Sequence, residues 1–172
     1  MPAFLLKLSG EALGGKAGVG IEPEILKHYC DEIEAAHREG IKLAVVLGGG
    51  NLFRGAHLAA AGMDRVIGDR MGMLATVMNG LALNDFLRRR GIVSQLFSGV
   101  PMPGMVEGYN RDTAKAAMQN GAVVILTGGT GNPFFTTDTA ACLRAVELGV
   151  DAILKATNVD GVYSSDPKNC LL

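Results

Sequence analysis

The feature that most constrains the fold is an apolar run followed at once by a glycine-rich loop and a helical pattern, within residues 122–149. The run Ala122–Leu126 is short and rich in β-branched residues, which is typical of a strand buried on both faces. Thr137 or Asp138 is a suitable N-cap for the helix, and Gly149 is a suitable stop. Loops between such strands and helix N-termini bind ligands and anions in α/β folds. The stretch therefore predicts a pocket for a phosphorylated molecule.

Apolar runs and helical patterns alternate along the rest of the chain. Strands are also expected at 4–8, 41–47, 91–97 and 151–155, and helices at 22–38, 63–90 and 111–119. A break in the long central helix is expected near Gly68 or Gly72, because glycine is a poor helix former. Strands that alternate with helices favour a mainly parallel sheet covered on both faces. We therefore expect a single domain over residues 1–172, built as a three-layer α/β/α sandwich.

Composition excludes several classes of partner and site. A net charge of −1 argues against nucleic acid or a membrane surface held by charge. Cys30, Cys142 and Cys170 are widely separated and form no C-x-x-C pair, so neither a disulfide framework nor a zinc site is expected. No apolar run approaches the roughly 18 residues that cross a membrane. These features favour a cytoplasmic protein.

Glycines and positive charges follow several of the predicted strands. Lys7 precedes a glycine turn, so it is either a snorkelling lysine or an ammonium directed at a phosphate. Gly48–Gly50 let the backbone approach a ligand closely, and Arg54 offers two parallel donors to a phosphate. Lys155 is either a second cation for phosphate or a surface lysine. Because parallel strands end at one edge of a sheet, the pattern predicts two phosphorylated ligands that face each other.

Two common nucleotide-binding motifs are only partly matched. Gly10 and Gly15-Lys16 have the spacing of a Walker A motif, but Ala17 stands where a serine or threonine would bind Mg²⁺. The glycines after the second strand lack the glycine that a dinucleotide fingerprint requires at Phe53. Neither motif is therefore assigned.

The long central helix carries two further features. Asp69 lies among apolar residues, where it either accepts hydrogen bonds from sugar hydroxyls or caps the following turn. Methionines recur at roughly helical spacing between Met63 and Met78, which favours a core or a subunit interface.

Five motifs, in this order, resemble the bacterial uridylate (UMP) kinases of the amino acid kinase fold family. They are Lys7–Leu13, Gly48–Gly55, Gly68–Thr76, Gly129–Asp138 and Lys155–Tyr163. The resemblance implies an amino acid kinase-like fold and transfer of the ATP γ-phosphoryl group to UMP, a step of pyrimidine biosynthesis, with Mg²⁺ accompanying ATP. Such a transfer depends on positioning and on neutralisation of charge.

The resemblance also implies roles for individual residues. It implies a catalytic set of Lys7, Arg54 and Asp138, with Asp138 orienting the site or the metal. It implies ATP contacts at Lys7, Leu8, Ser9, Gly10, Gly50, Arg54, Thr157, Tyr163 and Asp166. It implies UMP contacts at Gly49, Asp69, Thr130, Gly131, Asn132, Pro133, Phe134, Phe135, Thr136 and Thr137. The segment Gly15, Lys16, Ala17, Gly18, Val19 and Gly20 resembles the region linked to activation by GTP.

Partners and chain length follow from the same resemblance. It implies a homohexamer, with Met63–Met78 as a candidate interface, and regulation by GTP as activator and UTP as inhibitor. Family members continue past Asp166-Pro167, so the chain is expected to lack the family's C-terminal portion. Two alternatives stay open: a kinase of the same fold that acts on a carboxylate, and a UMP- or UTP-binding relative without turnover.

Overall fold

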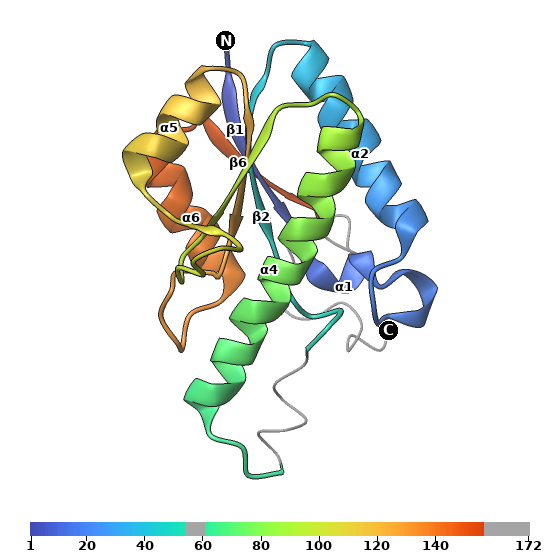
Figure 1. Ribbon diagram of the computed structural model, residues 1–172, viewed down its shortest axis with the longest axis vertical. Coiled ribbons are helices and arrows are strands. Elements are labelled where there is room, and N and C mark those ends of the chain that lie inside the picture. Colours follow the sequence, from blue (N-terminus) through green and yellow to red (C-terminus); the bar gives the residue numbers. More distant parts are fainter. Residues whose placement is uncertain (54–60, 157–172) are drawn as a thin grey trace, which may run out of the picture.

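The structure, a computed structural model, describes residues 1–53 and 61–156 and is built on a six-stranded sheet (Figure 1). The strands are β1 (Ala3–Leu8), β2 (Lys42–Leu47), β3 (Ser94–Ser98), β4 (Glu107–Gly108), β5 (Val123–Thr127) and β6 (Ala152–Ala156). They lie in the order β4-β3-β5-β2-β1-β6, and every neighbouring pair is parallel. The carboxyl ends of the strands therefore share one edge of the sheet.

Helices cover both faces of this sheet, as expected from the sequence. They are α1 (Gly10–Leu13), α2 (Pro23–Arg38), α4 (Arg65–Arg89), α5 (Arg111–Gln119) and α6 (Thr137–Leu148), with a 3₁₀ turn at Gly15–Ala17. The helices α5 and α6 lie on one face, and α2 and α4 lie on the other (Figure 1). The predicted three-layer α/β/α sandwich is confirmed. That residues 1–172 form a single domain remains a prediction.

The alternation of side chains along β2 shows why both faces are covered. Ala44 and Val46 pack into a core shared with α5 and α6, whereas Leu43, Val45 and Leu47 pack into a core shared with α2 and α4. A parallel strand buried on both faces carries an unbroken apolar run, which is the pattern read in the sequence. In the part of the chain that the structure describes, no helix is long and apolar enough to cross a bilayer.

The predicted break in the long central helix is wrong. The helix α4 runs without interruption for 25 residues through Gly68 and Gly72. It begins at the N-cap Asp64, whose Oδ1 accepts hydrogen bonds from the N–H groups of Val66 and Ile67 at 2.9 and 3.2 Å. A glycine costs a helix only about 1 kcal/mol, which the packing of α4 against α2 and the sheet offsets.

Smaller differences lie at the ends of elements. The N-cap of α6 is Thr136, which precedes both expected positions, Thr137 and Asp138, and its Oγ1 accepts from the Thr139 N–H at 3.2 Å. The third strand begins at Ser94 rather than residue 91. The short α1, the 3₁₀ turn and the two-residue β4 were not predicted, because such short elements leave no periodicity to detect.

Candidate functional site

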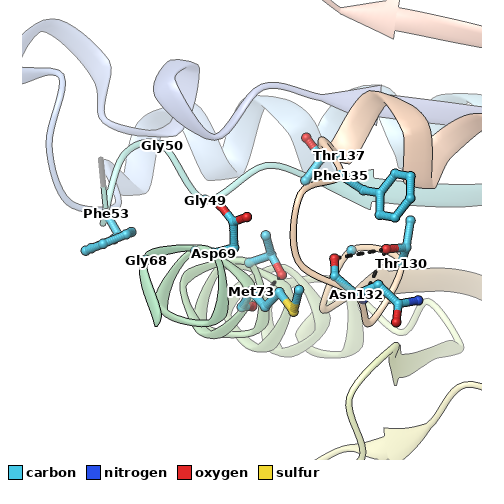
Figure 2. A pocket seen from close by; sticks show the side chains of 13 residues that line it. Gly49, Gly50, Phe53, Gly68, Asp69, Met73, Thr130, Asn132, Phe135 and Thr137 are labelled. Atoms are coloured by element: carbon cyan, nitrogen blue, oxygen red, sulfur yellow. Dashed lines mark hydrogen bonds between the residues drawn. The ribbon is translucent and has the colours of Figure 1, made fainter. Parts of the chain in front are cut away.

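A cavity of about 180 Å³ opens at the carboxyl edge of the sheet (Figure 2). Its walls come from the turn after β2, from α4 and from the loop between β5 and α6. It is lined by Gly49, Gly50, Phe53, Gly68, Asp69, Gly72, Met73, Thr76, Gly129, Thr130, Asn132, Phe135 and Thr137. In Figure 2 the labelled residues of α4 face those of the β5–α6 loop across the cavity. This is the place where parallel α/β sheets bind ligands.

One face of α4 forms a wall that sequence reasoning largely missed. Its members are Gly68, Asp69, Gly72, Met73 and Thr76. Only Asp69 was predicted as a site residue. The sequence could have indicated this wall through the spacing of these residues, because residues four apart lie on the same side of a helix. The two glycines, read as breaks, instead leave the helix surface without side chains beside the cavity.

The glycine-rich loop after β5 is held in place by buried contacts. The Gly128 N–H donates to Oγ1 of Thr76 at 2.7 Å, which ties the loop to α4. Gly131 has a φ of +84°, and a Cβ at that position would lie 2.6 Å from the carbonyl oxygen of Gly99. Only glycine fits such a position, because it tolerates positive φ and adds no side chain. The loop is therefore shaped before any ligand arrives.

Asp69 joins α4 to the same loop. Its Oδ2 accepts from the Phe134 N–H at 2.7 Å, and its Oδ1 accepts from Nε of Arg65 at 2.8 Å. Phe134 has a φ of +71°, and its ring lies 5.8 Å from the Arg65 guanidinium. Asp69 therefore bonds a residue 65 positions away rather than capping the following turn. Contact with sugar hydroxyls remains a prediction.

These contacts also change the titration of Asp69. Partial burial alone would raise its pKa, but hydrogen bonds from the Phe134 N–H and from Arg65, with the Arg65 charge, outweigh that effect. The pKa of Asp69 therefore lies below its ordinary value, and the carboxylate stays ionised near neutral pH.

Two lysines and one carboxylate meet beside the cavity. Lys7 Nζ lies 2.9 Å from Oδ1 of Asp138, and Lys155 Nζ donates to Oδ2 of Asp138 at 2.9 Å. Lys7 and Lys155 are register partners on the neighbouring strands β1 and β6, so their side chains point to the same face of the sheet. Asp138 lies in the first turn of α6 on that face. The Lys155 side chain is 53% exposed, so it is a surface lysine that pairs with Asp138, and its role as a second cation for phosphate remains a prediction.

The two lysines lower the pKa of Asp138. Burial would raise that pKa, but hydrogen bonds and charge from Lys155 and Lys7 outweigh it. The Lys7 side chain is only 11% exposed, so its ion pair with this carboxylate is largely shielded from water on the lysine side. The group carries two positive charges and one negative charge, which suits binding of an anion.

The end of β1 packs tightly on the turn after β2. A Cβ on Gly10 would lie 2.6 Å from the carbonyl carbon of Gly48 and 2.7 Å from the Gly50 nitrogen. This close approach brings the predicted ATP residues Lys7–Gly10 next to the glycine turn. Ser9 is the N-cap of α1 and makes no capping hydrogen bond through its side chain.

Apart from Lys7–Gly10, Asp138 and residues 15–20, the predicted site residues fall into three groups. Those that line the cavity are Gly49, Gly50, Asp69, Thr130, Asn132, Phe135 and Thr137. Those that share the β5–α6 loop without lining the cavity are Gly131, Pro133, Phe134 and Thr136. Those outside the described residues are Arg54, Thr157, Tyr163 and Asp166.

The predicted regulatory segment lies apart from the cavity. Gly15–Ala17 form a 3₁₀ turn, and Gly18 follows in the left-handed conformation, with a φ of +69°. Val19 is exposed, and Gly20 donates its N–H to the carbonyl oxygen of Asn51 at 3.0 Å. The segment is therefore connected through the backbone to the turn that lines the cavity.

Comparisons with known proteins agree with this geometry. The profile of the amino acid kinase family matches residues 2–171. The uridylate kinase of Alcanivorax borkumensis is 58% identical over 164 residues, which are 95% of this chain and 65% of the relative. That of Colwellia psychrerythraea is 58% identical over 169 residues, covering 96% of this chain and 68% of the relative. This chain thus spans about two thirds of the length of the curated relatives it matches.

Solved structures give the same result. The UMP kinase of Bacillus anthracis superposes with a TM-score of 0.92 at 39% identity, covering 98% of this chain and 71% of that protein. The UMP kinase of Ureaplasma parvum superposes with a TM-score of 0.91 at 35% identity, covering 98% of this chain and 72% of that protein.

Proposed function

The chain belongs to the amino acid kinase family, and on that premise we propose that it acts as a UMP kinase. In this reaction a phosphate oxygen of UMP forms a bond with the γ-phosphorus of ATP. The bond from that phosphorus to the β-phosphate oxygen breaks, so the products are UDP and ADP. The observation that carries the proposal is the Lys7–Asp138–Lys155 group, which lies beside a cavity walled by two glycine-rich segments.

The two lysines would stabilise the charge of the transferred group. Phosphoryl transfer places little covalent demand on the protein and depends on positioning and on electrostatic stabilisation. Asp138 holds both ammonium groups at 2.9 Å, so they are arranged before the substrates bind and need little reorganisation. Leu8, Ser9 and Gly10 extend the same surface toward ATP. Arg54, Thr157, Tyr163 and Asp166 belong to this proposal through the family motifs.

The cavity would hold UMP. Gly49 and Gly50 present backbone at the end of β2, where a phosphate can approach closely. Asp69 can accept further hydrogen bonds from ribose, because a carboxylate has about four acceptor positions. Thr130, Asn132 and Thr137 supply polar groups on the opposite wall. A site that bonds the edge of a base rejects analogues that leave those groups unpaired.

Mg²⁺ would enter with ATP rather than occupy a site built by the protein. Among residues 1–53 and 61–156 no cluster of three or more metal-ligating side chains occurs. Mg²⁺ in such enzymes is held by one or two carboxylates and by substrate phosphates. Asp138, whose two oxygens each pair with a lysine here, is the carboxylate that we propose orients the site or the metal. When bound, the metal neutralises phosphate charge.

The test is formation of UDP from UMP, ATP and Mg²⁺ by the 172-residue chain, with UMP binding measured in parallel by calorimetry. Lys7→Met removes one charge at similar length, and we expect kcat to fall by roughly 10²- to 10³-fold. Lys27→Met, on the exposed face of α2, is the matched control and should leave kcat unchanged. Phosphorylation of aspartate or N-acetylglutamate instead of UMP would contradict the proposal. Binding of UMP without UDP would indicate a relative without turnover.

We also propose assembly into a homohexamer through α4. Four large apolar side chains follow one stripe of this helix and remain 37–55% exposed: Ile67, Met71, Leu74 and Met78. Apolar patches of this kind mark protein interfaces. The proposal also includes regulation. GTP would activate the enzyme by binding at residues 15–20, and UTP would inhibit it by binding in the cavity.

A reducing, cytoplasmic location is part of the same proposal. Cys30 and Cys142 are both free thiols. Burial raises the pKa of Cys30 to about 11, which keeps that thiol protonated and unreactive. Free cysteines of this kind are typical of reducing compartments.

A further inference from the structure

A closed pair of asparagine side chains lies between α4 and the turn after β2. Nδ2 of Asn51 donates to Oδ1 of Asn79 at 3.0 Å, and Nδ2 of Asn79 donates to Oδ1 of Asn51 at 2.7 Å. Asn51 is 2% exposed and Asn79 is fully buried. Neither residue lines the cavity, and the proposed function assigns no role to either.

Each amide uses its remaining N–H to hold a glycine carbonyl. Asn79 donates to the carbonyl oxygen of Gly48 at 2.8 Å, and Asn51 donates to that of Gly20 at 2.7 Å. The backbone of Asn51 also accepts from the Gly20 N–H at 3.0 Å. All four side-chain N–H bonds of the pair are therefore satisfied, and they join three separate segments of the chain.

Stability alone does not account for this pair. Buried amides are costly unless fully hydrogen-bonded, and asparagine is a poor residue for the interior of a helix. Replacing both members of a buried polar pair with apolar residues of similar shape is often nearly neutral. What an apolar pair cannot do is hold the Gly48 and Gly20 carbonyls in one orientation.

We propose that Asn51 and Asn79 are positioning residues, which orient the Gly48–Gly50 turn for the UMP phosphate and couple that turn to Gly20. The inference rests on the proposed function and adds residues that act on the same site from outside the cavity.

Peptide geometry explains how the pair acts on the ligand. A trans peptide group places its C=O and N–H on opposite sides, so fixing the Gly48 carbonyl also fixes the direction of the Gly49 N–H. That N–H is directed away from Asn79, and it has no hydrogen-bond partner among the residues that the structure describes. Gly49 lines the cavity. The pair therefore presents an oriented, unpaired donor on the turn where a phosphate would bind.

The first experiment compares two asparagines of the same helix. Asn79→Leu removes the donors to Gly48 and Asn51, and we expect the Kd for UMP, measured by calorimetry, to rise on the order of tenfold. Asn84→Leu is the matched control, because the Asn84 side chain accepts a hydrogen bond from Ser94 at 2.7 Å and, among the described residues, makes none to the turn. In turnover assays Asn79→Leu should raise KM for UMP more than it lowers kcat. A loss of folded protein alone would lower kcat and leave KM unchanged.

The second experiment perturbs Gly20, whose carbonyl oxygen accepts a hydrogen bond from Asn51. Gly20 has a φ of +80°, and a Cβ there would meet no atom within 4 Å, so Gly20→Ala strains the backbone without a clash. We expect this variant to raise the Kd for UMP several-fold in the wild-type background and to add nothing in the Asn79→Leu background. If Asn79→Leu fails to fold, Gly20→Ala in the wild-type background decides the question.

Each outcome is distinct. If the wild-type chain binds UMP and either Asn79→Leu or Gly20→Ala binds it equally well, the inference is overturned while the proposed function stands. An equal rise in Kd for Asn84→Leu would also overturn it. If the wild-type chain does not bind UMP, the proposed function and this inference both fail.

Discussion

The hydrogen bond between Asp69 and the Phe134 N–H should control the shape of the loop after β5. The substitution Asp69→Asn is isosteric, and it replaces a charged acceptor with a neutral one. The new amide group would also face Nε of Arg65, which now lies 2.8 and 3.0 Å from the two carboxylate oxygens. We therefore expect the loop to detach more often from α4 and UMP to bind more weakly.

The magnitude follows from the bond and its surroundings. A hydrogen bond to a charged group contributes about 1.5–3 kcal/mol and a neutral one about 0.5–1.5 kcal/mol, so the exchange costs about 1 kcal/mol. We take about 1 kcal/mol, the low end of this difference, because the hydrogen bond is partly exposed to water: the Asp69 side chain is 21% exposed and Phe134 is 63% exposed. Phe134 also opposes closure, because its φ of +71° costs a residue other than glycine about 1–2 kcal/mol. About 1 kcal/mol corresponds to about a fivefold change in an equilibrium constant.

The assay is hydrogen exchange of the Phe134 amide without UMP, followed by measurement of the Kd for UMP. We expect about fivefold faster exchange and about fivefold weaker binding for Asp69→Asn. Exchange without UMP separates the role in the loop from any direct contact with ribose. Asp64→Asn is the matched control, because Asp64 caps the same helix and asparagine caps equally well.

The effect should also depend on pH in a defined direction. The pKa of Asp69 is lowered below its ordinary value in the folded chain. The stabilisation that the ionised Asp69 gives to the folded loop is therefore fully present above the ordinary pKa of about 3.9. It is lost as the pH falls through the lower pKa of the folded chain. The difference between wild type and Asp69→Asn should shrink only under acid conditions. Unchanged exchange at Phe134 near neutral pH would refute the reasoning.

Two further predictions concern α4. Gly80→Ala should destabilise the fold by about 1–2 kcal/mol, measured by denaturant unfolding, because its Cβ would lie 2.4 Å from Cγ2 of Thr127. Gly72→Ala, whose Cβ would lie 4.0 Å from the nearest atom, should instead stabilise the fold by up to about 1 kcal/mol. If both substitutions change the free energy of unfolding in the same direction, the difference in packing around these two glycines is contradicted. Leu74→Lys should dissociate the proposed oligomer in sedimentation velocity at micromolar concentration while changing monomer stability by less than about 0.5 kcal/mol. A wild-type chain that sediments only as a monomer would contradict the interface.

Local sequence patterns were sufficient for most of the fold. The strand, loop and helix of residues 122–149 were predicted within about one residue, because apolar runs, capping residues and glycines act over short distances. The shared edge of the strand ends followed from parallel pairing alone. The uninterrupted α4 was not predicted, because the local preference of Gly68 and Gly72 is outweighed by packing across the whole helix.

The sequence by itself determined the layers of this protein, the glycine-rich loops and the edge at which its site lies. Only the tertiary structure decided which side chains meet there. Lys7 and Lys155 share Asp138 because β6 lies next to β1 and pairs with it in a register that makes the two lysines partners, and no local pattern specifies that strand order. Asp69 with Phe134, and Asn51 with Asn79, are likewise contacts between distant segments. Periodicity reports which side of an element faces the core, whereas such contacts depend on how the elements are packed against one another.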